Sequence, residues 1–255
     1  DINKKQLSNY DLLGSIYIGT KAQELEKTLE SLVNQTHKPS NVFLVIDGDI
    51  IQEVKRILKK YINILPIKTV KIKNNVGLGL ALRRGLKECT SKIVLRFDTD
   101  DIYFKDRSYF IVKELDENNI DIVGSSVYEF DQNPENLLSE KKMPLSHSQI
   151  KKTIIFRNPI NHNSVGFIKD SILKLDGGYR HFPFYEDYDL WIRAIFSGLK
   201  FKNVNKSLLA MRISSQRSRR RGLKLILLEC RLFWSFFNTS KLHSFLFLLP
   251  VNLFL

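Results

Sequence analysis

Strand-like apolar runs alternate with helical segments over the first hundred residues, and this alternation limits the fold more than any other feature of the chain. Four runs have the length and apolar content of buried strands, and three amphipathic segments separate them. The predicted strands are Leu12–Tyr17, Val42–Ile46, Ile67–Ile72 and Ile93–Phe97, and the predicted helices are Ala22–Val33, Ile51–Tyr61 and Leu78–Glu88. Such alternation with short loops predicts an α/β fold that has a parallel sheet with helices on both faces.

The pattern is less regular in the second half of the chain. Residues Asp131–Ser146 are polar and include two prolines, which predicts a mobile loop over the edge of the sheet. A strand is expected at Ser164–Ile168 and a helix at Tyr185–Ser197. Because the sequence contains no internal repeat and no low-complexity linker, we expect one domain over residues 1–216, followed by a different segment, residues 217–255.

An acidic tetrapeptide, Asp-Thr-Asp-Asp at residues 98–101, follows the apolar run Ile93–Phe97. A second acidic turn, Asp47–Asp49, follows the apolar run Val42–Ile46 on the same expected edge of the sheet. Ligands of open α/β sheets bind at the carboxyl ends of the strands. Because Mg²⁺ prefers oxygen ligands and is often shared with substrate phosphates, the tetrapeptide suggests a metal between the protein and a diphosphate. The alternative is a solvated acidic turn that caps the following helix.

The chain is strongly basic, with 40 Lys and Arg against 27 Asp and Glu, a formal net charge of +13 and a pI near 9.6. This balance implies an anionic partner, which could be nucleic acid, an acidic membrane surface or a phosphorylated substrate. The two cysteines, Cys89 and Cys230, form neither a zinc set nor a disulfide framework, which fits a reducing compartment. The sequence begins without a recognisable signal peptide.

Basic and apolar side chains are interleaved in the segment 217–255. Seven Lys or Arg occur there against a single acid, Glu229, beside Leu, Phe and Trp residues. The apolar stretch Phe245–Leu255 is shorter than the ~20 residues that a spanning helix needs. This composition predicts an amphipathic helix that lies on an anionic membrane surface. The alternative is a helix packed on the rest of the protein or on a second subunit of a homodimer.

Short motifs are distributed over most of the chain. In order they are Ser15-Ile16-Tyr17, Leu29-Glu30-Ser31-Leu32, Asn34-Gln35-Thr36, Val45-Ile46-Asp47-Gly48, Asn75-Val76-Gly77-Leu78-Gly79, Arg96-Phe97-Asp98-Thr99-Asp100-Asp101, Asn161-His162, Gly177-Gly178-Tyr179, Glu186-Asp187-Tyr188-Asp189-Leu190-Trp191 and Arg220-Arg221-Gly222. In this order and spacing the chain resembles inverting family-2 glycosyltransferases, and among them the short bacterial enzymes of exopolysaccharide, capsule and O-antigen synthesis.

The resemblance implies the GT-A fold, a Rossmann-like, mainly parallel mixed sheet flanked by helices, here followed by the C-terminal amphipathic helical tail. Residues 1–130 would form the half that binds the nucleotide sugar, and residues 131–216 the half that binds the acceptor. The implied reaction transfers a sugar from a UDP-type nucleotide-sugar donor to a lipid-linked glycan acceptor. The enzyme would work at the cytoplasmic, inner face of the bacterial plasma membrane, held there peripherally by residues 217–255.

Roles on the donor side follow from the matched motifs. The resemblance implies that Asp47 contacts the nucleobase and that Ser15 and Tyr17 line the base and ribose. Asp98 would lie near the ribose and the metal, and Asp100 would bind the metal directly, as Mn²⁺ or Mg²⁺. The glycine-punctuated turn around Gly77 leads into a helix, whose N-terminal N–H groups attract anions such as a diphosphate.

Roles on the acceptor side come from the second half of the chain. The resemblance assigns the general base, which removes the proton from the acceptor hydroxyl, to Asp187. Glu186 would orient this base or bind the acceptor, and His162 is a candidate substrate contact. Three arginines are candidates for binding a diphosphate, an acceptor phosphate or lipid head groups: Arg212, Arg220 and Arg221.

Other function classes fit the sequence less well. A nucleic-acid-binding protein would explain the charge, but the chain lacks a zinc site, a helix-turn-helix signature and aromatic residues interleaved along strands, so nucleic acid is not an expected partner. An inactive transferase-like scaffold would not need the acidic turns. A nucleotidyltransferase would also use an aspartate cluster, but Gly19-Thr20-Lys21 is a poor match to its glycine-rich signature.

Overall fold

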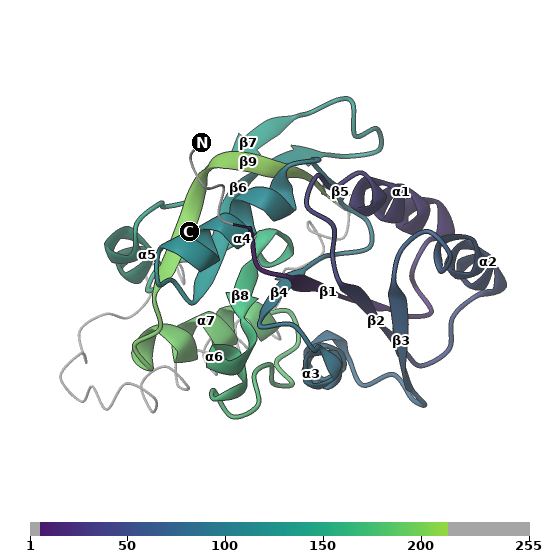
Figure 1. The fold of residues 1–255 in the computed structure, drawn as a ribbon, viewed down its shortest axis with the longest axis horizontal. Helices are drawn as coiled ribbons and strands as arrows, with labels where there is room; N and C mark the ends of the chain where they lie inside the picture. The colour runs from purple at the N-terminus through teal and green to yellow at the C-terminus, as the bar shows by residue number, and fades with distance from the viewer. Residues whose placement is uncertain (1–5, 214–255) are drawn as a thin grey trace, which may run out of the picture.

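The computed structural model describes residues 6–213, which form a nine-stranded mixed sheet with helices on both faces (Figure 1). The strands are β1 (Tyr10–Ile16), β2 (Asn41–Asp47), β3 (Ile67–Ile72), β4 (Ile93–Arg96), β5 (Ile102–Tyr103), β6 (Ile122–Phe130), β7 (Ser139–Lys141), β8 (Gly166–Ile168) and β9 (Phe201–Arg212). The helices are α1 (Ala22–Val33), α2 (Gln52–Tyr61), α3 (Leu78–Glu88), α4 (Arg107–Glu117), α5 (His147–Thr153), α6 (Lys169–Leu173) and α7 (Glu186–Phe196), with a 3₁₀ turn at His162–Ser164.

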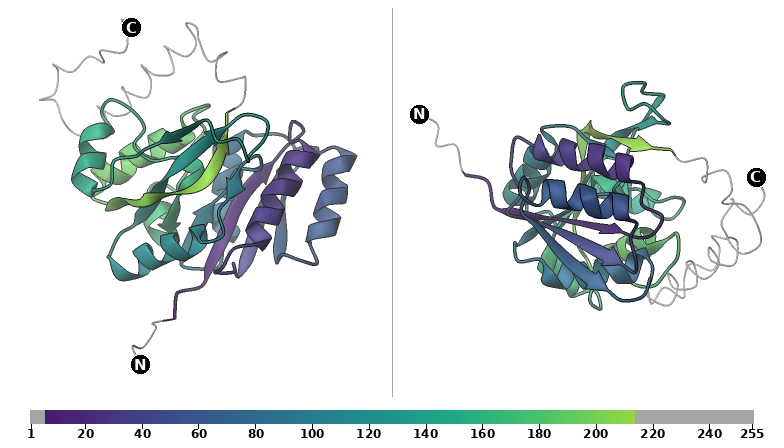
Figure 2. Two further views of the ribbon diagram at one scale, coloured as in Figure 1. Left: turned by 90° about the horizontal axis from the view of Figure 1, so that it is seen from above. Right: turned by 90° about the vertical axis from the view of Figure 1, so that its right-hand side faces the viewer.

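The first four long strands form the parallel part of the sheet, in the order β3-β2-β1-β4. Successive side chains of β1 point to opposite faces, so Leu12 packs with α1, α2 and α4 while Leu13 packs with α3 and α7. Figure 2 shows the helices covering both faces of the sheet. The predicted helices at Ala22–Val33 and Leu78–Glu88 and the strand at Ile67–Ile72 are confirmed with the same bounds.

The remaining strands extend the sheet beyond β4 in the order β8-β6-β9-β5. Strand β8 runs antiparallel to both β4 and β6, whereas β6 and β9 form a parallel pair. Most of the paired residues therefore lie in parallel ladders, and the predicted mixed, mainly parallel sheet is confirmed. The polar segment Asp131–Ser146 was expected to be a loop throughout, but it contains β7, which pairs antiparallel with β6.

The topology brings chain segments that are far apart in sequence to one edge of the sheet. Strands β1, β2 and β4 are parallel, so their carboxyl ends lie together, at Ser15, Asp47 and Asp98. The short strand β5 comes directly after the acidic tetrapeptide and pairs antiparallel with β9. This pairing places Arg212 beside Asp101.

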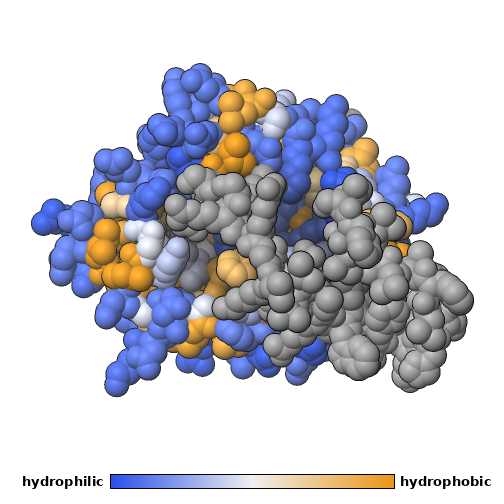
Figure 3. Space-filling view, turned by 180° about the vertical axis from the view of Figure 1, so that it is seen from behind, coloured by the Kyte–Doolittle hydropathy of each residue, from blue (hydrophilic) through white to orange (hydrophobic). Residues whose placement is uncertain are grey.

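The described surface is mainly hydrophilic in the view of Figure 3, with small separate apolar groups. No helix within residues 6–213 is long and apolar enough to cross a membrane. The amphipathic tail predicted for residues 217–255 lies outside the described residues.

Candidate active site

Two cavities open at the carboxyl edge of the parallel strands. The smaller cavity has a volume of about 370 Å³, and the larger has a volume of about 620 Å³. Three residues line both cavities: Leu78, Asp98 and Asp100. The acidic tetrapeptide therefore forms the boundary between two binding spaces, and a molecule in one space lies next to a molecule in the other.

The smaller cavity brings together the residues expected to bind a nucleotide. Ser15, Tyr17, Asp47 and Gly77 all line it, together with Asp98. Tyr17 is 51% exposed, and its ring lies against Gly19, where an added Cβ would come within 2.6 Å of the ring. The aromatic face is thereby held at the rim of the cavity by the loop between β1 and α1.

Asp47 organises the loop that leads into α3. Its carboxylate accepts hydrogen bonds from the backbone N–H of Val76 at 2.8 Å, from that of Gly77 at 3.0 Å and from Asn75 Nδ2 at 3.0 Å. Gly77 can end this loop because it has φ of +87°, a conformation that favours glycine. Two N–H groups that the sequence suggested for anion binding are thus already bonded to Asp47.

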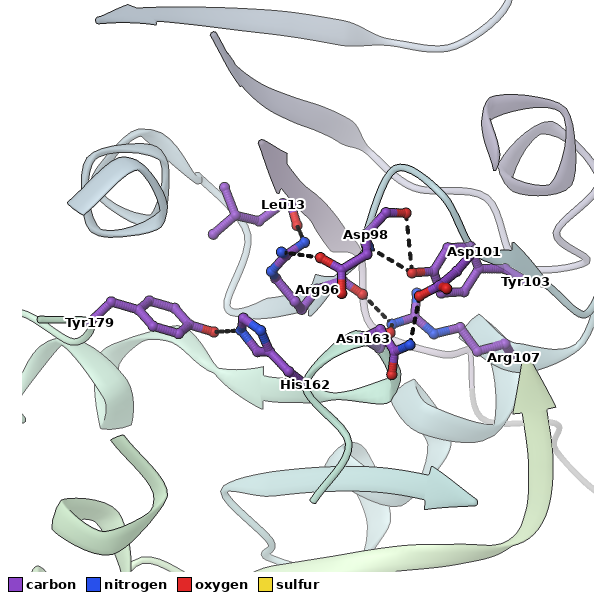
Figure 4. Close-up of polar contacts among 9 residues, drawn as sticks. All are labelled: Leu13, Arg96, Asp98, Asp101, Tyr103, Arg107, His162, Asn163 and Tyr179. Carbon is purple, nitrogen blue, oxygen red and sulfur yellow. Dashed lines mark hydrogen bonds and ion pairs between the residues drawn. The ribbon is translucent and has the colours of Figure 1, made fainter. Parts of the chain in front are cut away.

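The carboxylates of the acidic tetrapeptide have different partners (Figure 4). Asp98 forms an ion pair with Arg96 at 2.5 Å. Asp101 is buried and accepts hydrogen bonds from Asn163 Nδ2 at 2.6 Å and from the backbone N–H of Arg212 at 2.8 Å. No hydrogen bond from another described side chain reaches the Asp100 carboxylate. The carboxylate of Asp100 is therefore available to a ligand.

Burial, together with the neighbouring carboxylates of Asp98 and Glu24, raises the pKa of Asp100 to about 6. Burial, together with Asp100, also raises the pKa of Asp101. Such a group of carboxylates gathers negative charge that a divalent cation would offset, and its hard oxygen atoms are the ligands that Mg²⁺ and Mn²⁺ prefer. The residues present thus fit a divalent metal, although no three His, Cys, Asp or Glu side chains within residues 6–213 form a complete metal cage.

Two buried arginines support the acidic tetrapeptide from below. Arg96 is 1% exposed, and Arg107 is fully buried. Arg107 donates hydrogen bonds to the carbonyl oxygens of Arg96 and Asn163, and its guanidinium lies 4.6 Å from the centre of the Tyr103 ring. Neither arginine was predicted from the sequence as a site residue. A charged residue inside the apolar run Ile93–Phe97 was the available signal for Arg96.

Asp187 lies in the wall of the larger cavity, at the start of α7. Its Oδ2 atom accepts a hydrogen bond from Asn158 Nδ2 at 2.6 Å. Burial raises the pKa of Asp187 to about 6, and the hydrogen bond from Asn158 opposes this rise. A carboxylate that titrates near neutral pH suits general-base catalysis. Glu186 and His162, two of the predicted acceptor contacts, line the same cavity.

His162 is held in its neutral form. Its Nε2 atom lies 3.0 Å from the hydroxyl oxygen of Tyr179, a contact that Figure 4 shows. Burial lowers the pKa of His162 to about 3, and the positive charge of Arg96 acts in the same direction. A neutral imidazole at the cavity wall can exchange hydrogen bonds with a hydroxyl group without adding charge.

Arg212 lines the larger cavity, but its guanidinium already has protein partners. It donates hydrogen bonds to the backbone carbonyls of Asp131 at 2.5 Å and Asp100 at 3.3 Å, and it lies 3.5 Å from Glu24. The side chain thereby ties β9 to the acidic tetrapeptide and to α1. Of the other predicted phosphate ligands, Arg220 and Arg221 lie outside the described residues.

Solved structures with a similar fold include glycosyltransferases. The structure of residues 1–349 of S. aureus TarS in complex with UDP-GlcNAc aligns with a TM-score of 0.69 at 16% identity, over 90% of this chain and 67% of that chain. The mannosyltransferase PcManGT from Pyrobaculum calidifontis, in complex with GDP-Man and Mn²⁺, aligns with a TM-score of 0.64 at 14% identity, over 93% of this chain and 74% of that chain. These likenesses support a GT-A-like fold.

Sequence relatives are closer. The chain is 34% identical over 226 residues to the amylovoran biosynthesis glycosyltransferase AmsE of Erwinia amylovora, covering 88% of this chain and 84% of that protein. It is 33% identical over 233 residues to the UDP-Gal:alpha-D-GlcNAc-diphosphoundecaprenol beta-1,3-galactosyltransferase of Escherichia coli, covering 91% and 84%. The family model described as glycosyl transferase family 2 matches residues 16–175. Its relatives include glycosyltransferases of amylovoran and O-antigen biosynthesis, and the chain belongs to glycosyl transferase family 2.

Proposed function

We propose that this protein transfers one sugar, with inversion, from a UDP-sugar to a lipid-linked bacterial glycan during the synthesis of exopolysaccharide, capsule or O-antigen. The observation that carries the proposal is the pair of cavities that meet at Asp98 and Asp100, with the carboxylate of Asp187 in the wall of the larger one. The donor class is supported by the UDP-GlcNAc bound to TarS. The acceptor class is supported by the diphosphoundecaprenol in the name of the E. coli relative.

The smaller cavity would hold the nucleotide. Tyr17 would cover the base or ribose from the rim, and Ser15 would line the floor beside them. The Asp47 carboxylate accepts three hydrogen bonds from the protein and can accept about four in all. It would accept the fourth from an imide N–H of the base. Gly77, at the N-terminus of α3, adds no side chain to the smaller cavity.

Asp98 and Asp100 would hold a divalent metal, Mn²⁺ or Mg²⁺, between the two cavities. The metal supplies Lewis-acid stabilisation of the departing diphosphate. The contribution of the protein is to hold two carboxylates at a fixed strand end, with Asp98 oriented by its ion pair to Arg96. PcManGT, which has a similar fold, was solved with Mn²⁺.

Asp187 would act as the general base in the larger cavity. The acceptor hydroxyl loses its proton to the Asp187 carboxylate as its oxygen bonds to the anomeric carbon. The bond from that carbon to the diphosphate oxygen breaks on the opposite face, which inverts the configuration. Glu186 would bind the acceptor beside the base, and His162 would exchange a hydrogen bond with a sugar hydroxyl.

The division of labour along the chain is part of the same proposal. Residues 1–130 would bind the donor and residues 131–216 the acceptor, within one catalytic domain. The basic and apolar segment 217–255 would bind an anionic membrane peripherally, at the inner face where a lipid-linked acceptor is found.

The proposal is tested by incubating the protein with each of a panel of UDP-, GDP- and dTDP-sugars, Mn²⁺, and an undecaprenyl-diphosphate-linked sugar. Mass spectrometry of the lipid product should show the mass of one added sugar with a UDP-sugar. The variant Asp187→Asn should retain binding of UDP but lose about 10²–10⁴-fold in turnover, which is the usual contribution of a general base. Absence of product with every donor, or full turnover by Asp187→Asn, would contradict the proposal.

A further inference from the structure

The carboxylate of Asp187 is held by a residue that lies 29 positions earlier in the chain, on the loop between α5 and the 3₁₀ turn. The hydrogen bond from Asn158 Nδ2 to Asp187 Oδ2 is 2.6 Å long, and both side chains line the larger cavity. We propose that Asn158 is a positioning residue that orients Asp187 and favours its ionised form. This inference rests on the proposed function, in which Asp187 is the base.

The direction of the Asn158 amide is fixed by a second hydrogen bond. Its Oδ1 atom accepts from the backbone N–H of Ile160 at 3.2 Å, so its Nδ2 atom is the one that faces Asp187. The next residue is Pro159, which restricts Asn158 to extended backbone conformations. The carbonyl of Pro159 accepts a hydrogen bond from Asn203 Nδ2 at 3.1 Å, which ties the loop to β9. The loop therefore presents a preoriented donor to the base.

The Asn158–Asp187 hydrogen bond is not needed to attach this part of the chain to α7. A separate hydrogen bond does so, because Tyr188, the next residue of the helix, donates from its hydroxyl to the carbonyl of Ile154 at 2.5 Å. Asp187 and Tyr188, both of which line the larger cavity, thus bond to the region after α5, Asp187 through its carboxylate and Tyr188 through its hydroxyl. The attachment and the contact to the base can be tested separately.

A neutral amide such as that of Asn158 is a suitable hydrogen-bond donor to a general base. Burial disfavours the charged carboxylate, and Asp98 across the cavity and Glu186 beside it add negative charge, while the hydroxyl of Tyr179 adds none at neutral pH. Asn158 offsets part of this cost with a neutral hydrogen bond. A Lys or Arg at this position would stabilise the carboxylate so strongly that it would become a poor proton acceptor. An amide keeps the carboxylate ionised and still basic.

The test compares pH profiles of kcat/KM for the wild-type protein with those of Asn158→Leu and Asn158→Asp. Leu has a similar volume but donates no hydrogen bond, and Asp places a second carboxyl group against the first. The rise of kcat/KM on the acidic side of the profile, its acidic limb, should move to higher pH in the order wild type, Asn158→Leu, Asn158→Asp. The shift for Asn158→Leu should be about one pH unit. Turnover of Asn158→Leu should then fall about fivefold at pH 6 and recover at pH 9, while the KM for the nucleotide sugar stays unchanged.

The matched control is Tyr188→Phe, which removes the hydrogen bond from the Tyr188 hydroxyl to the carbonyl of Ile154. It should lower the melting temperature without moving the acidic limb. A shift of the limb in Tyr188→Phe equal to that in Asn158→Leu would mean that Asn158 acts only by holding the loop. That result, or an unmoved limb in both Asn158 variants, would overturn the inference.

A second measurement does not depend on activity. Carbon-13 NMR of labelled aspartate carboxyls, assigned with Asp187→Asn, follows the titration of Asp187 directly. The midpoint should be higher in Asn158→Leu than in the wild type, and an unchanged midpoint would contradict the inference even if the protein transferred no sugar. If Asn158→Leu does not fold, Asn158→Ser, which keeps a smaller donor, should give a smaller shift in the same direction. Failure of sugar transfer with a normal NMR result would count against the proposed function alone.

Discussion

The aspartates of the site differ in what surrounds each carboxylate rather than in their position along a strand. Asp47 and Asp101 each accept hydrogen bonds from backbone N–H groups, and Asp98 is paired with a buried arginine. Burial raises the pKa of Asp100 and of Asp187 to about 6, and it also raises the pKa of Asp101. Four of these carboxylates thus have a protein partner, Asp187 through Asn158, whereas no described side chain donates a hydrogen bond to the carboxylate of Asp100.

The role of Asp100 in metal binding can be tested by its effect on stability. The variant Asp100→Asn should lose the rise in melting temperature that Mn²⁺ with UDP produces in the wild type, because a ligand that binds only the folded state stabilises it. Without metal at pH 8, the same variant should be more stable than the wild type by about 1 kcal/mol, since it removes one of several like charges. Asp49→Asn, at the exposed second acidic turn, is the control and should change neither result. A Mn²⁺ response in Asp100→Asn equal to that of the wild type would remove Asp100 from the metal site.

The pH dependence has a defined sign. A protonated Asp187 cannot accept a proton, so kcat/KM at saturating Mn²⁺ should rise with pH through about 6 and then level off.

The contribution of Asp187 to stability falls as the pH rises. Because the pKa of Asp187 in the folded protein lies above its unfolded value of 3.8, this group contributes stability that is present below about pH 4 and lost as the pH rises through 6. Asp187→Asn should therefore be inactive yet at least as stable as the wild type in urea unfolding at pH 8. A variant that is inactive because it is unfolded would contradict this assignment.

At the scale of elements, the contact between α3 and the segment before α7 joins the two cavities. A Cβ atom added at Gly79 would lie 2.1 Å from the carbonyl oxygen of Arg180 and 3.0 Å from Glu186 Cγ. The absence of a side chain at this position lets the first turn of α3 pack directly against the entry to α7. The helix that lines the smaller cavity thereby positions the helix that carries Asp187.

The variant Gly79→Ala should separate these two helices. The expected loss is about 1–3 kcal/mol in the free energy of unfolding, as for other overpacked sites, together with a fall in turnover because Asp187 moves away from the boundary of the cavities. Urea unfolding and kcat measure the two effects. Arg84→Ala, on the exposed face of the same helix, is the control and should stay within about 0.5 kcal/mol of the wild type. Equal stability of Gly79→Ala and Arg84→Ala would show that the contact is not tight.

The sequence predicted the elements of the first half well because each strand there is a short apolar run between turn residues. In the second half, β6 contains Gly-Ser-Ser, and β9 alternates irregularly and pairs with β6 through register shifts at Ser125 and Ser126. Burial between neighbouring strands, rather than local propensity, keeps these segments extended. The acidic edge of the site was predictable for the same reason, since it follows the regular strands. Asn158 lies in an irregular loop, and nothing local indicates that it reaches Asp187.

At the scale of the whole molecule, net charge and membrane association are the features to test. The chain carries a net charge of +13, and each basic side chain near an anionic leaflet contributes about 1 kcal/mol of binding. The protein should sediment with vesicles that contain phosphatidylglycerol at low salt, and about 1 M NaCl, which shortens the Debye length to about 3 Å, should release part of it. Vesicles of phosphatidylcholine alone are the control. Equal binding to both kinds of vesicle would exclude a charge-driven association.

The order of the two cavities along the chain has an evolutionary consequence. All residues that line the smaller cavity fall between Ser15 and Asp100, whereas the larger cavity, apart from the shared boundary, is lined by residues 101–213. A single genetic crossover just after Asp100 between two related genes would thus join one parent's smaller cavity to the residues that the other parent contributes to the larger cavity outside the shared boundary. The pairing of β4 with β8 is the main ladder that such a hybrid would have to preserve. Under the proposed function, such a hybrid would combine the donor preference of one parent with the acceptor preference of the other.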